Sequence, residues 1–276
     1  MRTSTREGMA FLVITLGLSW LVFWGPLALF GVPTISFVDD TTGPLWAIVL
    51  FMIGGFTPSL TALVMIGARD GRAGLRAIWT RLTRFDIGWR WYLAILGVVA
   101  AGGAGQILLF RILGYGFDYR VFVLQLGSLA PLLVIGPLSE EIGWRGYALD
   151  RLQSEWGPLP ASLVIGTAWG LWHLPLFHMI GTSQSSLGIP FLGFLVGTIL
   201  LSVVFTWLHN ETGGSVWTAV ALHWVYTWVG QVVATGATRS TLYNWLEYLP
   251  WLLIAGVVAI AGIGIRTGLR PTRTVD

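Results

Sequence analysis

The chain has 276 residues, of which 55% are hydrophobic and 11% are charged, and its formal net charge is +3. Soluble domains carry about 25% charged residues, so this composition and a mean hydropathy of +0.74 exclude a soluble globular protein. The sixteen basic residues are all arginine and form no nucleic-acid-binding pattern, and the lack of cysteine excludes disulfides, thiolate metal ligands and a cysteine nucleophile.

Eight apolar stretches are long enough to form helices of about 20 residues that cross a hydrocarbon core about 30 Å thick. They lie near residues 10–31, 44–68, 90–113, 121–148, 158–180, 188–208, 215–235 and 245–265. The first is too long for the apolar core of a signal peptide and is expected to be retained. Pro131 and Pro137 interrupt the fourth. The predicted fold is therefore all-α: a polytopic integral membrane protein with about eight transmembrane helices.

We expect one membrane domain over residues 1–276, in three parts. Residues 1–120 form the N-terminal helices with a cytoplasmic amphipathic loop at 69–90, residues 121–235 form a catalytic helical core, and residues 236–276 form the C-terminal helix and a basic tail. Within the loop, Leu75, Ile78, Trp79 and Leu82 fall at helical spacing, a pattern that is typical of a short helix lying in the membrane interface.

The arginines predict the orientation of the chain in the membrane. With eight spans, thirteen arginines fall on the side of the two termini: Arg2, Arg6, those from Arg69 to Arg90, Arg145, Arg151, Arg266, Arg270 and Arg273. The opposite side keeps Arg111, Arg120 and Arg239. By the positive-inside rule both termini lie in the cytoplasm, and the protein is expected in a prokaryotic cell membrane, with the lipid bilayer as its first partner.

Several ionisable residues interrupt this apolar pattern. An ionisable group within a bilayer segment costs on the order of 2.5–3.5 kcal/mol on insertion scales and persists where it is paired or performs chemistry. Those inside predicted spans are Glu140, Glu141, Arg145, His173 and His223. Two further histidines lie near the ends of spans, where we expect them at the membrane interface: His178 and His209.

Helical geometry separates the two glutamates. Glu141 and Arg145 are four residues apart with the acid first, the favourable order for an ion pair within a helix. Glu140 is rotated by about 100° from Glu141 and lacks that partner. A carboxylate in this setting is a candidate general base for activating water; the alternative is that Glu140 pairs with an arginine of another helix.

The histidines share helical faces with nearby residues. His173 follows Trp169 by four residues, so we expect the two rings to stack, and His223 precedes Thr227 by four. A single histidine in an apolar helix is more often a hydrogen-bonded packing residue. Two histidines and a carboxylate pair on three separate spans favour a functional site.

Three segments resemble the motifs of the CAAX-protease and bacteriocin-processing (CPBP) family of intramembrane peptidases, which includes the Rce1-type prenyl-protein proteases. Residues 140–146 (EEIGWRG) resemble its EExxxR motif, and residues 169–173 (WGLWH) resemble FxxxH with Trp in place of Phe. Residues 212–217 (TGGSVW), which lead to His223, resemble the segment before its HxxxN motif. The match runs from about residue 136 to 230.

The resemblance implies an active-site cavity between the fourth, fifth and seventh helices and an intramembrane endopeptidase that hydrolyses a peptide bond of a membrane-associated protein or peptide, including prenylated CAAX-type substrates. It implies that Glu140 and His173 activate the attacking water. Glu141, Arg145 and Trp169 would support the first motif and its neighbours.

The resemblance also implies that His223 stabilises the oxyanion of the tetrahedral intermediate. Thr227 takes the place of the family's asparagine; it is shorter and has one hydrogen-bond donor rather than two. This departure keeps open a second interpretation, in which the chain is a non-catalytic immunity or regulatory relative.

The cofactor is left open by the sequence. Glu140, His173 and His223 supply three nitrogen or oxygen ligands with an open fourth position, as in zinc hydrolases. The Rce1-type resemblance implies instead a metal-independent glutamate mechanism, and we expect no tightly bound metal. A third interpretation is a small proton-coupled transporter, against which stands the lack of repeated halves.

Overall fold

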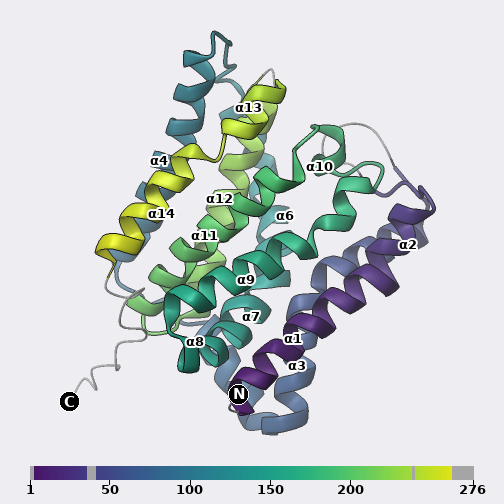
Figure 1. The fold of residues 1–276 in the computed structure, drawn as a ribbon, viewed down its shortest axis with the longest axis vertical. Helices are drawn as coiled ribbons and strands as arrows, with labels where there is room; N and C mark the ends of the chain where they lie inside the picture. Colours follow the sequence, from purple (N-terminus) through teal and green to yellow (C-terminus); the bar gives the residue numbers. More distant parts are fainter. Residues whose placement is uncertain (1–2, 36–41, 238–239, 263–276) are drawn as a thin grey trace.

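The computed structural model describes residues 3–35, 42–237 and 240–262. Within these ranges the chain is helical, and its only strand-like features are the isolated bridges Ile35–Thr42 and Phe117–Ala237. The helices run side by side, with the N-terminus and α8 at one end of the molecule and α10 and α13 at the opposite end (Figure 1). The prediction of an all-α fold is confirmed.

The helices follow the apolar stretches in chain order. The first stretch contains α1 (Thr3–Gly17), η1 (Leu18–Phe23) and α2 (Trp24–Leu29), and the next two are α3 (Leu45–Leu82) and α4 (Trp89–Ile112). The fourth is a series of short pieces: α5 (Val121–Leu124), η2 (Gln125–Ser128), α6 (Leu129–Leu133), η3 (Val134–Leu138), α7 (Ser139–Gly143), η4 (Trp144–Leu149) and α8 (Asp150–Trp156). The remainder are α9 (Pro158–Trp172), η5 (Leu174–His178), α10 (Ser183–Ser186), α11 (Phe191–Glu211), α12 (Val216–Gly236), α13 (Thr241–Leu246) and α14 (Leu249–Ala261).

Six helical segments of the described chain are long and apolar enough to cross a membrane: 4–29, 45–82, 89–112, 121–156, 191–211 and 241–261. The other two predicted spans are helical but fall outside this group. One is α9, with only 15 residues, and the other is α12, which has 21 residues but carries several polar side chains. The count of eight spans therefore stays a prediction.

Two predicted boundaries are wrong for identifiable reasons. The fifth span was expected over residues 158–180, but α9 ends at Trp172 and a 3₁₀ turn follows. Pro175 lacks an N–H group and disfavours helix in the residue before it, which ends the helix early. The fourth span was expected to end at 148, but it continues to Trp156 because the charge of Asp150 is taken up by Arg81 and His209.

The segment predicted as an amphipathic loop is the second part of α3. Gly71 has φ 58° and ψ −148°, so the helix bends there and then continues to Leu82. Ile78 on its apolar side is buried. Arg81 donates to the carbonyls of Gly146 and Gly214, at 3.0 and 2.8 Å. This segment is therefore fixed to the helical bundle by hydrogen bonds.

Glycines allow the helices around the core to approach closely, as expected for membrane helices. A Cβ atom on Gly166 of α9 would lie 2.6 Å from the Cα atom of Ile199 in α11, and one on Gly143 of α7 would lie 2.5 Å from the carbonyl oxygen of Pro58 in α3. On Gly197 it would lie 2.4 Å from the ring of Tyr248. Helices α7 and α9, which carry the candidate site, are thus held at close backbone distance by α3 and α11.

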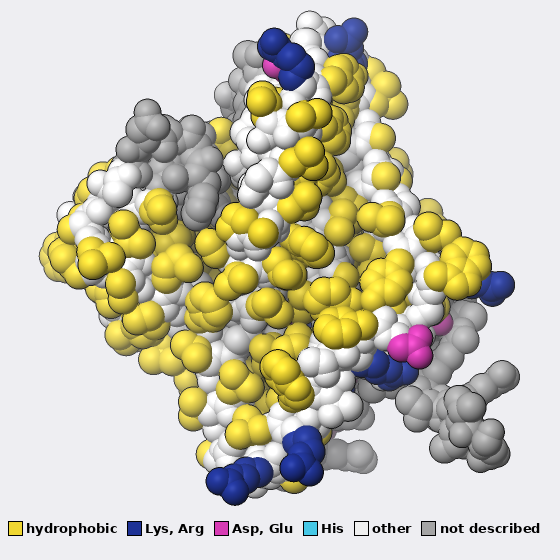
Figure 2. Space-filling view, turned by 180° about the vertical axis from the view of Figure 1, so that it is seen from behind, with side chains coloured by type: hydrophobic (Ala, Val, Ile, Leu, Met, Phe, Trp, Pro, Cys, Tyr) yellow, Lys and Arg dark blue, Asp and Glu magenta, His cyan; other side chains and the backbone are white. Residues whose placement is uncertain are grey.

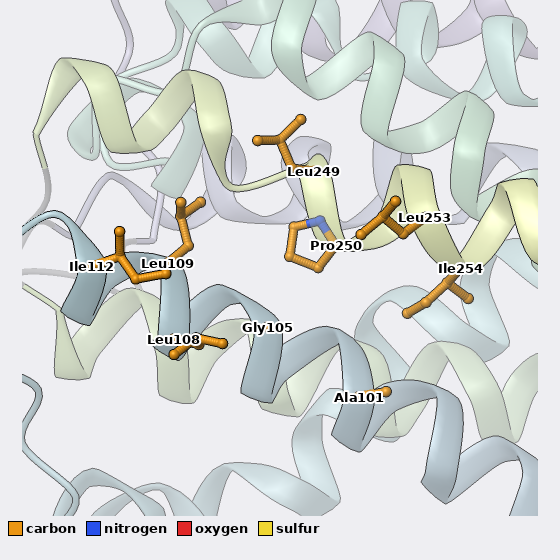
Figure 3. A pocket seen from close by; sticks show the side chains of 9 residues that line it. All are labelled: Ala101, Gly105, Leu108, Leu109, Ile112, Leu249, Pro250, Leu253 and Ile254. Atoms are coloured by element: carbon orange, nitrogen blue, oxygen red, sulfur yellow. The ribbon is translucent and has the colours of Figure 1, made fainter.

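The outer surface is apolar. Figure 2 shows hydrophobic side chains across the middle of one face, with charged side chains at its margins. Leu21, Val64, Leu253 and Ile260 are between 69% and 79% exposed, as a surface in contact with lipid requires. A groove of about 350 Å³ on this surface lies between α4 and α14 and is lined by apolar residues such as Leu108 and Leu253 (Figure 3). It contains none of the predicted site residues.

Candidate active site

A cavity of about 750 Å³ lies within the bundle and is lined by five of the predicted site residues: Glu140, Trp169, His173, His223 and Thr227. Glu140 reaches it from α7, His173 from the end of α9, and His223 and Thr227 from α12. These are the fourth, fifth and seventh predicted helical segments, so the expected position of the cavity is confirmed. Residues of α2, α3, α4, η2, α10, α11 and the α13–α14 junction also line it.

A break in the fourth helical segment shapes the cavity next to Glu140. Ile135 is extended, with φ −89° and ψ 103°, and Gly136 has φ 109° and ψ −85°, a conformation that a residue with a side chain rarely adopts. Ser139 holds the break: its hydroxyl donates to the carbonyl of Gly136 and accepts from the N–H of Gly136, both at 3.0 Å. The next helical turn, with Glu140 and Glu141, is thereby fixed against the break.

Gly136 faces two functional groups at once. A Cβ atom placed on it would lie 3.6 Å from Nε2 of His223 and 3.9 Å from Oε1 of Glu140. One point in the cavity is therefore within 4 Å of a carboxylate oxygen and of an imidazole nitrogen. The missing side chain leaves room there for a water molecule or a substrate atom.

Two tryptophans bind the other oxygen of Glu140. The indole N–H of Trp169 donates to Oε2 at 2.6 Å, and that of Trp144 lies 3.4 Å from the same atom. Glu140 is only 5% exposed. Among the described residues no ion pair joins Glu140 to an arginine, and the arginine four residues after Glu141 pairs with Glu141. Oε1 is the oxygen left to face the cavity.

Glu141 is fully buried and joins two helical segments. It forms the expected ion pair with Arg145, whose NH1 lies 2.9 and 3.0 Å from its two carboxylate oxygens. It also accepts a hydrogen bond from Nδ1 of His223 at 2.8 Å. The second contact was not predicted. It links α7 to α12 and fixes the orientation of the His223 ring.

Arg145 is stabilised by aromatic rings on its remaining faces. Its guanidinium carbon lies 4.1 Å from the ring centre of Phe205 and 4.9 Å from that of Trp169. Its Nε and one terminal nitrogen have no hydrogen-bond partner in the described structure. Cation–π contacts of this kind are favourable where water is excluded, so Arg145 balances the buried charge of Glu141 from a largely apolar environment.

His173 caps the end of α9, and its ring orientation is fixed by the backbone. Its Nδ1 lies 2.8 Å from the carbonyl oxygen of Trp169, and because a carbonyl oxygen only accepts, Nδ1 carries the hydrogen. Nε2 therefore presents a lone pair. The two rings are in contact on one helical face, as expected, and they meet edge to face at 62° with centroids 6.1 Å apart.

A buried polar network supports this end of α9 from behind. The indole N–H of Trp172, the residue before His173, donates to the hydroxyls of Ser19 at 2.5 Å and Thr57 at 3.1 Å. Those hydroxyls lie 2.6 Å from each other. The first helical segment and α3 are thus connected to the position of His173.

His223 lies between two aromatic rings, with centroids 5.5 Å from Trp169 and 5.8 Å from Phe205. Thr227 lines the same cavity one helical turn later. Five residues that the sequence singles out therefore line one cavity, while Glu141 and Arg145 lie behind it. The sequence did not identify Trp144, Ser139 and Gly136, for which the short spacing to Glu140 was the only available signal.

The two histidines at span ends are not alike. His209 was expected at the interface, but it is fully buried. Its Nε2 lies 3.3 Å from Asp150 and 3.3 Å from Arg81, so it belongs to the polar cluster that fixes α8 to α3. His178 ends the 3₁₀ turn after His173 and is exposed.

Glu140, His173 and His223 are the three candidate ligands for a metal ion. Among the described residues no group of three or more His, Asp or Glu side chains is arranged to hold a metal ion. One nitrogen or oxygen atom of each of the three candidate ligands is already hydrogen-bonded to a protein partner. All three side chains line the same cavity.

Comparison with known proteins gives two findings. Residues 121–229 match the family model described as type II CAAX prenyl endopeptidase Rce1-like. The chain is also similar to CAAX prenyl protease 2 of Methanococcus maripaludis, with 33% identity over 93 residues. That alignment covers 32% of this chain and 34% of the archaeal protein, so the similarity spans about a third of each.

Proposed function

We propose that the chain is an intramembrane endopeptidase, since its residues 121–229 match the family model described as type II CAAX prenyl endopeptidase Rce1-like. The observation that carries the proposal is the pair of free atoms beside Gly136. A carboxylate oxygen and an imidazole nitrogen lie within 4 Å of one point in an open cavity inside an apolar bundle. Peptide hydrolysis needs a proton acceptor for the attacking water molecule and a hydrogen-bond donor for the carbonyl oxygen of the peptide.

Glu140 acts as the general base. Its Oε2 is occupied by the indole of Trp169, so Oε1 accepts the first proton of the attacking water. Nε2 of His173, which carries a lone pair, accepts the second hydrogen of the water as a hydrogen bond. The water oxygen then has a lone pair directed at the carbonyl carbon, with both of its hydrogens held.

His223 stabilises the oxyanion. Its Nδ1–H is bound to the carboxylate of Glu141, so its Nε2 donates only when the ring is an imidazolium. Glu141 stabilises that cation, as the carboxylate of a catalytic triad does for its histidine. Removing one oxyanion donor costs about 2.7–4 kcal/mol in an acyl-transfer enzyme.

The cycle closes without another reactant. Water attack forms the C–O bond and leaves a proton on Glu140 and a negative oxygen beside His223. When the tetrahedral intermediate collapses, the C–N bond breaks and Glu140 returns its proton to the departing amine. Thr227, one turn after His223, lies in the wall of the cavity and offers a single hydroxyl to the same region.

The substrate class follows from the location of the site. A bond reaches Glu140 only in a protein or peptide that is held at the membrane. The relative's name concerns prenylated CAAX proteins, and we include prenylated peptides among the substrates to be tested. The protein would be integral to the cell membrane.

The test is cleavage in reconstituted vesicles. Membrane-anchored peptides, with and without a prenyl group, are incubated with the wild-type protein and with Glu140→Gln. We expect cleavage by the wild type and its loss in the variant, because glutamine cannot accept the proton. Glu155→Gln makes the same chemical change on α8, outside the cavity, and should retain full activity.

Other outcomes assign another function. Cleavage that survives Glu140→Gln contradicts the mechanism. Proton-coupled uptake without cleavage identifies a transporter, and an intact fold with neither activity identifies a non-catalytic relative. Metal analysis of the active preparation, with activity measured after chelation, determines whether a divalent ion such as zinc takes part.

A further inference from the structure

The site cavity extends toward one end of the molecule. Beyond the site residues it is lined by polar side chains from the ends of helices and their connections, namely Gln125, Ser128, Thr182, Ser183, Gln184 and Thr235. Thr182, Ser183 and Gln184 lie at the start of α10, and Thr235 lies in the last turn of α12 before α13. Gln125 accepts a hydrogen bond from Trp228 in the same part of α12. Helices α10 and α13 mark one end of the molecule in Figure 1. No described lining residue comes from the α3–α4 turn, from α8 or from the α11–α12 turn, which lie at the other end.

Glu140 lies deep within the bundle. It precedes Asp150, at the start of α8, by ten residues, which corresponds to about 15 Å of helix. It follows Gln125 by fifteen residues, across the break at Gly136. The cavity therefore extends from the middle of the bundle to the end with α10 and α13, and it is closed toward the end with α8.

The described arginines distinguish the two ends. Eight belong to the end with α8: Arg6, Arg69, Arg72, Arg76, Arg81, Arg84, Arg90 and Arg151. Two belong to the opposite end, Arg111 and Arg120, and Arg120 is paired with Asp118 at 2.8 Å. Arg145 is buried at the site and is not counted. The other predicted arginines, Arg2, Arg239, Arg266, Arg270 and Arg273, lie outside the described residues.

By the positive-inside rule the basic end faces the cytoplasm. Combining this orientation with the position of the cavity, we infer that the active-site cavity opens to the outer side of the cell membrane. Its substrates are proteins or peptides whose scissile bond is presented from that side. The statement about substrates rests on the proposed function. The direction in which the cavity opens does not depend on catalysis.

The natural absence of cysteine makes the direction directly measurable. Ser186→Cys places one thiol on α10 at the open end, and Ser154→Cys places one on α8 at the basic end; both serines are exposed. A charged maleimide that does not cross membranes is added to spheroplasts of a bacterial expression host. We expect labelling of Ser186→Cys in intact spheroplasts and of Ser154→Cys only after detergent is added.

A second pair of variants tests the cavity itself. Ser128→Cys lies in the cavity wall, and Ser162→Cys lies on α9 with no exposed surface. A small cationic thiosulfonate that does not cross membranes should modify Ser128→Cys from outside, to the extent seen in detergent. Ser162→Cys should stay unmodified in intact spheroplasts.

Labelling of Ser154→Cys from outside, equal labelling of both exposed positions, or protection of Ser128→Cys from the external reagent overturns the inference. None of these measurements uses peptide cleavage. Failure of the orientation is thus distinguished from failure of the proposed function, which the Glu140→Gln comparison decides alone.

Discussion

Trp169 gives Glu140 a contact that the phenylalanine of the family motif cannot make. Its indole N–H donates to Oε2 at 2.6 Å, while its ring also faces His223 and the guanidinium of Arg145. A hydrogen bond to a charged group contributes about 1.5–3 kcal/mol. Trp169 therefore contacts both buried charged groups, Glu140 and Arg145, and it also orients Glu140, the proposed general base.

We therefore expect Trp169→Phe to lower kcat by about 10- to 100-fold, the effect of losing about 1.5–3 kcal/mol of carboxylate orientation. Phenylalanine retains most of the ring and its contacts, so the melting temperature should change little. Trp144→Phe is the matched control, because its N–H is 3.4 Å from the same oxygen and should cost much less. Equal losses in both variants would show that the shorter hydrogen bond has no special role.

The extent to which the site could be predicted differs between residues. The ion pair of Glu141 and Arg145 depends only on four-residue spacing within one helix, and the sequence predicts it. The contact of Glu141 with His223 joins residues 82 positions apart, and no periodicity describes it. The polar partners behind Trp172 likewise come from distant segments. The sequence names the site residues through their motifs, but their hydrogen-bond partners require the fold.

At the level of helices, hydropathy predicts where the apolar segments lie, because crossing a bilayer requires an apolar run of a certain length. It does not predict where a segment bends. The extension of α3 beyond Gly71, the early end of α9 before Pro175 and the break at Gly136 all follow from single residues whose local conformations differ from a helix. The break at Gly136 also leaves open space in the cavity beside Glu140 and His223.

Close packing of α9 against α11 leads to a prediction about stability. Gly166→Ala places a methyl group 2.6 Å from the Cα atom of Ile199, which forces the two helices apart. We expect a loss of about 1–3 kcal/mol in stability, seen as a lower melting temperature in detergent. Cleavage should fall as well, because α9 carries Trp169 and His173.

Gly97→Ala in α4 is the control for that experiment. Nothing lies within 4 Å of a Cβ atom at this position, and alanine favours a helix over glycine by up to about 1 kcal/mol. Its melting temperature should be unchanged or slightly raised. A Gly166→Ala protein as stable as Gly97→Ala would contradict the close approach of the two helices.

At the scale of the whole molecule, the cavity is lined by more acidic than basic side chains. Its described lining includes the carboxylates of Glu140 and Glu247 but no lysine or arginine. The positive charge of Arg145 is already paired with Glu141. The charge of the His223 imidazolium is balanced by Glu141. An acidic side chain brought beside Glu140 would therefore meet like charge, with no lysine or arginine in the described lining to offset it.

We expect this asymmetry to select among substrates. In a series of membrane-anchored peptides that differ at one residue beside the scissile bond, aspartate should lower kcat/KM by about tenfold or more relative to alanine. This corresponds to about 1.4 kcal/mol of unfavourable interaction. Lysine should be tolerated. Cleavage of the aspartate peptide at the rate of the alanine peptide would show that charge in the cavity does not influence selection.

The two tryptophan contacts to Oε2 of Glu140 have a stereochemical consequence. Because that oxygen is occupied, the proton taken from water and the proton given to the departing amine must both pass through Oε1. The nitrogen of the scissile peptide must therefore lie on the same side of the carboxylate as the incoming water. Only one of the two faces of the peptide plane satisfies this condition, so the chirality of the tetrahedral carbon is determined before the reaction begins.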